Sequence, residues 1–138
     1  SWLTPGPAGS VGRDSSTGNL CFESASVTLR PRNSDPPSYT EIELGPHGHY
    51  LALRLRGIRQ PHRQVFLSHY SARIDGQRWS AQARLPWVFL PRQPFLLNAY
   101  AIHGVGEHRR YLAMSPVPGD GPDFHRLEYF TRAWEPGI

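Results

Sequence analysis

The stretch YTEIELGPHGHYLALRLRG, residues 39–57, decides the fold class of this chain. Between Tyr39 and Leu44, glutamates alternate with apolar or neutral side chains, and between Tyr50 and Arg56 leucines alternate with other residues. A period of two is typical of half-buried β-strands. The intervening sequence GPHG, residues 45–48, supplies a bend. The stretch therefore predicts an antiparallel hairpin.

The alternation also predicts which side chains of this hairpin face the core. The residues expected to point inward are Thr40, Ile42, Leu44, Leu51, Leu53 and Leu55. The charged residues expected to point outward are Glu41, Glu43, Arg54 and Arg56. On that arrangement the glutamates pair with the arginines across the ladder, each pair contributing about 0.2–1 kcal/mol.

Short strands are expected in the rest of the chain as well. They are predicted at 22–29, 64–74, 78–87, 94–104 and 109–116. The segment 94–104 is apolar on both sides, which predicts a central strand that pairs with 109–116. Asp75-Gly76 is a hairpin turn signal. Phe124, Leu127 and Phe130 are expected to cap the core, the last two from a helical turn. The fold class is an antiparallel all-β sandwich.

Composition divides the chain into three parts. The 138 residues include 13 glycines and 14 prolines, a content that favours short strands and turns over long helices. Residues 1–38 are rich in Gly, Ser and Pro and are expected to be largely disordered. The predicted domains are this flexible N-terminal segment, a β-sandwich over residues 39–131, and a tail over residues 132–138.

Several classes of protein are disfavoured by the same composition. No apolar run approaches the roughly 20 residues that cross a bilayer, and the N-terminus does not resemble a signal peptide. The single cysteine, Cys21, excludes an internal disulfide and a cysteine-built zinc site. The expectation is a soluble, intracellular, cytoplasmic protein. The net charge of +4 comes from 15 arginines that are scattered rather than clustered, so nucleic-acid binding is not favoured.

Candidate chemistry is sparse. Seven histidines are present, but no HExxH or HxxEH pattern occurs, so no metal ligand is assigned. No G-x-S-x-G elbow or phosphate-binding glycine loop occurs, and no residue is assigned to catalysis. Glu41 and Glu43, two residues apart on one strand, are suited either to acid–base chemistry or to charge matching with the arginines. We favour charge matching, and contact with a polar ligand remains open.

Three blocks of sequence carry a resemblance to a known family. They are YTEIELGPHG (39–48), LPW followed by NAYAIHG (85–87 and 98–104), and PDFHRLEYF (122–130). Over residues 38–131 the chain resembles uncharacterised protein family 0462, the "chromosome 4 open reading frame 33" type. Its layout is more distantly similar to family-9 carbohydrate-binding modules and DOMON-like β-sandwiches. Residues 1–38 do not match the strands that precede this region in the family, which implies a truncated or alternative form with an incomplete sandwich.

The resemblance implies a non-catalytic domain without a cofactor that binds a carbohydrate or another small polar ligand. The alternative is a protein-interaction or regulatory module that uses an open sheet edge for self-association or for a partner; a metal-dependent hydrolase is third. Asp123 and His125 are either a hydrogen-bonded pair at a binding rim or a turn cap that leaves Phe124 in the core. Asn98 is expected to be a buried polar residue that needs partners or a ligand. The candidate ligand-binding residues are Tyr39, Glu41, Glu43, His47, Trp87, Asn98, Asp123 and His125.

Overall fold

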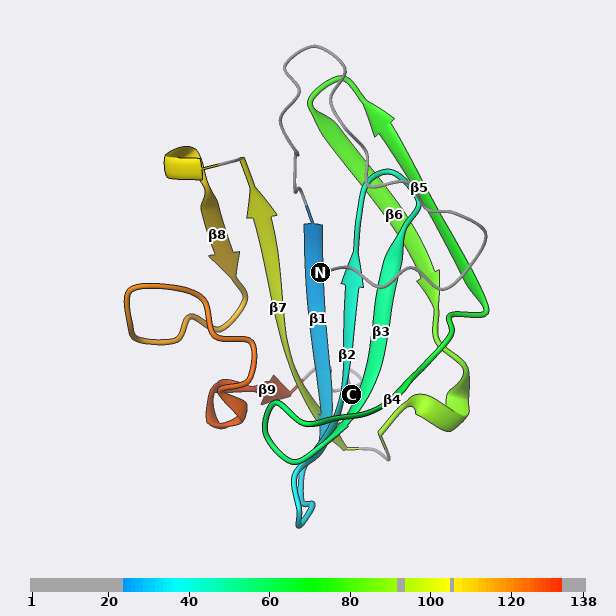
Figure 1. Ribbon diagram of the computed structural model, residues 1–138, viewed down its shortest axis with the longest axis vertical. Coiled ribbons are helices and arrows are strands. Elements are labelled where there is room, and N and C mark those ends of the chain that lie inside the picture. Colours follow the sequence, from blue (N-terminus) through cyan, green and yellow to red (C-terminus); the bar gives the residue numbers. More distant parts are fainter. Residues whose placement is uncertain (1–23, 92–93, 105, 133–138) are drawn as a thin grey trace, which may run out of the picture.

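The computed structural model describes residues 24–91, 94–104 and 106–132, and these form two antiparallel β-sheets (Figure 1). The larger sheet has the strand order β4-β3-β2-β1-β7-β8, with β9 also paired to β7, and the smaller is the β5–β6 hairpin. The strands are β1 (Ser24–Pro31), β2 (Ser38–Leu44), β3 (Tyr50–Arg56), β4 (Pro61–Gln64), β5 (His69–Asp75), β6 (Arg78–Arg84), β7 (Phe95–His103), β8 (Arg110–Ala113) and β9 (Thr131–Arg132). Three short 3-10 turns complete the fold, namely η1 (Trp87–Phe89), η2 (Gly106–His108) and η3 (Leu127–Tyr129). The predicted all-β fold class is confirmed.

The hairpin that the sequence predicted is present as β2 and β3. Its register pairs Leu44 with Tyr50 and Tyr39 with Leu55, so the five residues 45–49 form the turn. Gly48 within that turn has a φ of 86°, a conformation that side chains with a Cβ rarely adopt. The predicted central strand is also present, because β7 lies between β1 and β8 and pairs with both.

The observed register corrects the predicted orientation of β3. Glu41 lies opposite Leu53 and Glu43 opposite Leu51, whereas Arg54 lies opposite Thr40. The leucines of β3 therefore share a face with the glutamates, and the predicted Glu–Arg pairs across the ladder are wrong. The reason is that both faces of this sheet are covered. Alternation along each strand therefore does not show which side chains of β3 lie on the same face as the glutamates of β2.

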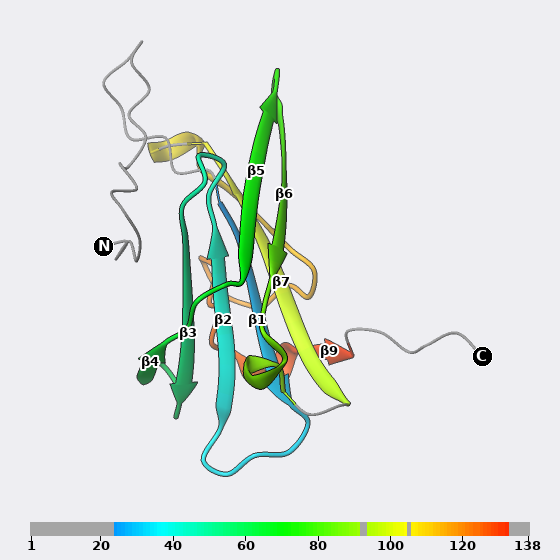
Figure 2. The ribbon, with the colours of Figure 1, turned by 90° about the vertical axis from the view of Figure 1, so that its right-hand side faces the viewer.

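The two faces of the large sheet are covered by different parts of the chain. We call one the hairpin face, because Ile42, Ala52 and Leu29 pack there with Val65 and Leu67 of the segment after β4. The β5–β6 hairpin and η1 cover it through Tyr70, Leu85, Phe89 and Leu90. The hairpin lies beside β2 and β3 at the side of the molecule far from β8 (Figures 1 and 2).

We call the opposite side the hollow face. It carries Tyr39, Glu41 and Glu43 of β2, and the pairing places Ser26 and Thr28 of β1 beside the two glutamates. At one end Leu127 and Phe130 pack against buried Tyr39 and Leu55, closing a second core cluster. The 3-10 turn η3 places Leu127 and Phe130 on the same side, which confirms the predicted capping of the core by this segment.

Two further expectations differ from the observed strands. The segment 64–74 is not one strand, because β4 ends at Gln64 and β5 begins at His69. Val65 and Leu67 between them are buried in the core, and their side chains anchor the crossing from the large sheet to the hairpin. The described sheet also begins before the predicted boundary at residue 39, since β1 is an inner strand between β2 and β7. Residues 1–23 and 133–138 lie outside the described part of the chain.

Candidate functional site

Six of the eight candidate residues gather on the hollow face or on the segment that covers it. Tyr39, Glu41 and Glu43 alternate along β2, and Thr28 of β1 pairs with Glu41 on one side and with Asn98 of β7 on the other. Asp123 and His125 belong to the chain segment that crosses this face before η3. Six candidates from three separate sequence blocks thus share one side of the sheet.

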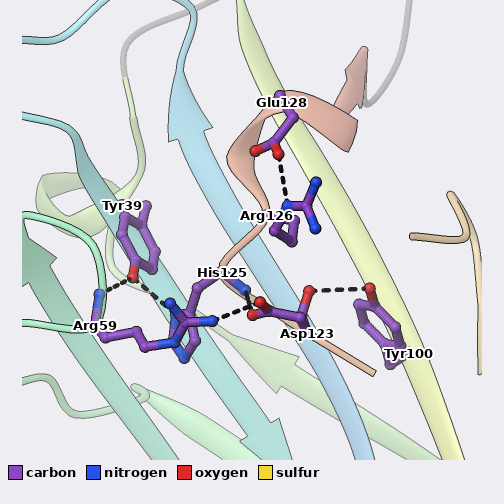
Figure 3. A network of polar contacts seen from close by, with 7 residues as sticks. All are labelled: Tyr39, Arg59, Tyr100, Asp123, His125, Arg126 and Glu128. Atoms are coloured by element: carbon purple, nitrogen blue, oxygen red, sulfur yellow. Dashed lines mark hydrogen bonds and ion pairs between the residues drawn. The ribbon is translucent and has the colours of Figure 1, made fainter. Parts of the chain in front are cut away.

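A polar network ties the C-terminal segment to the sheet, as Figure 3 shows. The backbone N–H of Arg59 donates to Tyr39 Oη at 2.9 Å, and Tyr39 Oη lies 2.8 Å from His125 Nδ1. The backbone N–H of His125 donates to Asp123 Oδ1 at 3.0 Å, and the Arg59 guanidinium forms an ion pair with the same carboxylate. Tyr100 Oη donates to the carbonyl of Asp123 at 3.3 Å.

Burial determines the protonation of this network. Tyr39 is fully buried, and its oxygen accepts the Arg59 N–H and shares a second hydrogen bond with Nδ1 of His125, whose donor depends on the histidine tautomer. Desolvation, and then the nearby Arg59 charge, lower the pKa of His125, which favours the neutral ring. Burial raises the pKa of Asp123, but the His125 N–H and Arg59 outweigh it, and the pKa lies below its ordinary value. These four residues fasten the covering segment in place.

Asn98 has its hydrogen bonds satisfied within the protein. Its Nδ2 donates to the carbonyl of Ser115 at 2.8 Å, and its Oδ1 accepts the N–H of Ser115 at 2.9 Å. The side chain is almost fully buried, as the sequence led us to expect. Its partners hold the loop after β8 against β7, so the observed contacts of Asn98 are structural.

A hollow of about 300 Å³ opens on the hollow face at the end of β2 away from Tyr39. We call it the polar hollow; its lining residues are Ser24, Ser26, Glu43, Leu51, Ile102, Arg109 and Phe124. Both serines are buried, and Ser26 Oγ and Arg109 Nε are buried without a hydrogen-bond partner in the described part of the chain. Buried polar atoms are usually paired, so these two are suited to meeting a ligand.

Gly104 helps to place Arg109 at the polar hollow. It follows β7 with a φ of 76°, and a Cβ at this position would approach the carbonyl oxygen of His108 to 2.7 Å. Only glycine accommodates both the conformation and this close approach. The backbone N–H of Arg109 then donates to the carbonyl of Gly106 at 3.2 Å, so a tight connection leads from β7 to the arginine.

Two carboxyl groups lie side by side at the polar hollow. Glu43 lines it, and Glu41 follows on the same face toward Tyr39. Burial, and then the neighbouring Glu43, raise the pKa of Glu41 to about 7, and burial raises the pKa of Glu43. Neither carboxylate has an ion pair with a described residue. Near neutral pH this face therefore presents, in Glu41, a carboxyl group that can be protonated and can donate as well as accept hydrogen bonds.

The remaining two candidates lie elsewhere. His47 is exposed in the β2–β3 turn, with its ring stacked near that of His49 at a centroid distance of 6.5 Å. Trp87 begins η1, which belongs to the covering of the hairpin face, and it is 84% exposed. Neither residue lines the polar hollow.

Sequence reasoning missed Ser24, Ser26, Arg109 and Phe124 as parts of one site. A signal for the serines was present, because in SASVTL, residues 24–29, small polar residues alternate with apolar ones. That alternation indicates a strand with one polar face, but it does not show which strands lie beside it in the sheet. Arg109 and Phe124 carried no such signal, because the β7–β8 connection and the covering segment bring them to the hollow.

The fold and site define a class, an antiparallel β-sandwich with a polar hollow on one face of its larger sheet. In the described ranges no group of three or more His, Cys, Asp or Glu side chains is arranged to hold a metal ion. A search of the described helical segments finds none with the length and apolar character to cross a membrane.

Comparison with known proteins supports the family resemblance drawn from the sequence. The chain is 41% identical over 104 residues to the UPF0462 protein C4orf33 homolog of Danio rerio, covering 71% of this chain and 53% of that protein. It is 39% identical to the Mus musculus homolog and 38% identical to the Homo sapiens UPF0462 protein C4orf33, again over 104 residues and 71% of this chain. These matches cover 54% and 52% of the two relatives, so the chain spans about half the length of the curated relatives it matches.

No protein-family model matches the chain, and neither does any solved structure. The resemblance to family-9 carbohydrate-binding modules and DOMON-like sandwiches is therefore not supported by these comparisons.

Proposed function

We propose that this domain is a non-catalytic module that binds a small saccharide or polyol in the polar hollow. The observation that carries the proposal is the pair of buried polar atoms, Ser26 Oγ and Arg109 Nε, which have no hydrogen-bond partner among the described residues and line the same hollow as the Glu43 carboxyl. Sugars present closely spaced hydroxyl groups that both donate and accept hydrogen bonds. A guanidinium donor, a serine hydroxyl and the Glu43 carboxyl are matched to such a pattern.

Apolar surface completes this match. Leu51, Ile102 and Phe124 line the same hollow, and apolar walls with a few convergent polar groups are the usual composition of small-molecule sites. The volume of about 300 Å³ lies at the lower end of the range for such sites. A ligand the size of one sugar unit suits it better than a larger aromatic molecule.

The test is a panel of monosaccharides and disaccharides measured by saturation-transfer NMR at about 5 mM saccharide, where weak binding is detectable. We expect transfer to at least one sugar, reduced in the variants Glu43→Gln and Ser26→Ala. The matched control is Glu107→Gln, because Glu107 is an exposed carboxylate outside the hollow. Absence of transfer across the panel, or transfer unaffected by both hollow variants, would reject the proposal.

A second candidate function is association with another polypeptide through the small sheet. In the described part of the chain this sheet consists of β5 and β6 alone, so each has an unpaired outer edge. Ile74 on β5 is 49% exposed. Unpaired edges beside exposed apolar residues favour strand addition. Light scattering after size exclusion tests this candidate, and a monomer at all concentrations would count against self-association.

A further inference from the structure

A second, larger hollow adjoins the polar hollow and shares Arg109 with it. We call it the outer hollow; it has a volume of about 530 Å³, and its walls include Tyr100, Arg109, Tyr111 and Asp120. Tyr100 of the outer hollow packs edge-on against Phe124 of the polar hollow, with ring centroids 4.5 Å apart. Arg109 and one aromatic pair thus link the linings of the two hollows.

Arg109 is the cation common to both hollows, and it has no acidic partner among the described residues. The ion pairs among the described residues use Arg59, Arg73, His108 and Arg126 as cations, but not Arg109. Its guanidinium carbon instead lies 5.5 Å from the centre of the Tyr111 ring, and its Nε is buried without a hydrogen-bond partner. Stacking on an aromatic ring holds a guanidinium in one orientation while leaving its donors free.

The carboxyl groups of the walls do not neutralise this cation. Glu43 lines the polar hollow without reaching ion-pair distance of Arg109. Asp120 belongs to the exposed loop on the other wall of the outer hollow and makes no ion pair with Arg109 either. A guanidinium that stacks on a ring and has no counterion in the described part of the chain is matched in shape and charge to a carboxylate, which it can bind through two parallel hydrogen bonds.

We propose that the ligand is an acidic saccharide of at least two units, with one sugar in the polar hollow, the next in the outer hollow, and a carboxylate bound by Arg109. This inference rests on the proposed saccharide-binding function and adds the charge and the length of the ligand. The two sugar units lie on either side of the Tyr100–Phe124 pair, which supplies apolar surface to both. Arg109 selects the sugar that bears the carboxylate.

The experiment compares cellobiose with cellobiuronic acid, which differ by one carboxylate, in calorimetric titrations of the full chain. We expect cellobiuronic acid to bind about tenfold more tightly than cellobiose, as a charge-assisted hydrogen-bond pair allows. In Arg109→Met, which keeps the length of the side chain, the two sugars should bind alike. Arg73→Gln is the matched control, because Arg73 is an exposed arginine of β5 outside both hollows, and it should retain the preference.

A second measurement on the unaltered protein keeps the test independent of how Arg109→Met folds. Raising the salt concentration from about 50 to about 500 mM should weaken binding of cellobiuronic acid and leave binding of cellobiose nearly unchanged. Equal affinities for the two sugars, or a preference that survives high salt, would overturn the inference while leaving the proposed function in place. Failure of both sugars to bind, with failure of the wider panel, would overturn both.

Discussion

Replacing Glu41 by glutamine should change how the free energy of unfolding depends on pH. Glu41 is buried on the hollow face, and burial with the adjacent Glu43 raises its pKa from the ordinary 4.5 to about 7. Each pKa unit corresponds to about 1.4 kcal/mol, so the shift amounts to about 3 kcal/mol. An acid with a raised pKa in the folded state holds its proton more tightly when folded. Its contribution to stability is therefore complete below pH 4.5 and is lost as the pH rises through about 7.

Glutamine has the shape of the protonated carboxyl and does not titrate. Near pH 4.5 the Glu41→Gln variant should therefore match the parent protein, and near pH 8 it should be more stable by up to about 3 kcal/mol. Urea unfolding followed by circular dichroism at a series of pH values measures this difference. Titrating groups other than the coupled Glu43 cancel, because they are common to both proteins.

The control for this experiment is Glu107→Gln, at a side chain that is 89% exposed. Its unfolding free energy should follow that of the parent at every pH, within the small effects usual for surface positions. If the unfolding free energy of Glu41→Gln also follows that of the parent from acid to alkaline pH, Glu41 is not a buried carboxyl with a raised pKa. Its placement on the hollow face would then be wrong.

Four further substitutions test other contacts. Tyr39→Phe should cost about 1–3 kcal/mol in urea unfolding, because it leaves the Arg59 N–H without its acceptor, whereas the exposed Tyr111→Phe should cost little. Phe130→Ala should cost about 3–5 kcal/mol in the same assay, since it empties part of the second core cluster; a loss below about 1 kcal/mol would contradict that packing. Trp87→Ala should leave both stability and saccharide affinity unchanged, and a loss of affinity would place the site on the hairpin face. Gly104→Ala should lower saccharide affinity as well as stability, because it displaces the connection that carries Arg109; unchanged binding would argue against the role of Arg109.

The fold class was predictable because the side chains alternate with a period of two over several segments. The β2–β3 hairpin and the central position of β7 followed from pattern alone. The pattern did not show which side chains lie on which face of the large sheet. It depends on the cross-strand register, which the five-residue turn 45–49 sets, and a sheet covered on both sides gives no polarity signal to reveal it.

The candidate site was predictable in part. The polar residues of β2 were visible because glutamates in a strand pattern are conspicuous, and Asp123 and His125 stood out in a short distinctive block. Arg109 was not distinguishable from the other fourteen arginines, since only the tertiary fold places it at both hollows. Trp87 was selected for its aromatic character, but the position of η1 places it away from the hollow.

Chemical-shift mapping tests the central claim, ligand binding in the polar hollow, most directly. Amide and arginine Nε–H resonances of the nitrogen-15-labelled protein would be followed while a saccharide from the panel is added. The account predicts that shifts concentrate at Ser26, Glu43 and Arg109, with none around Trp87 or the β5–β6 hairpin. Shifts confined to the hairpin face, or no shift with any saccharide, would contradict it.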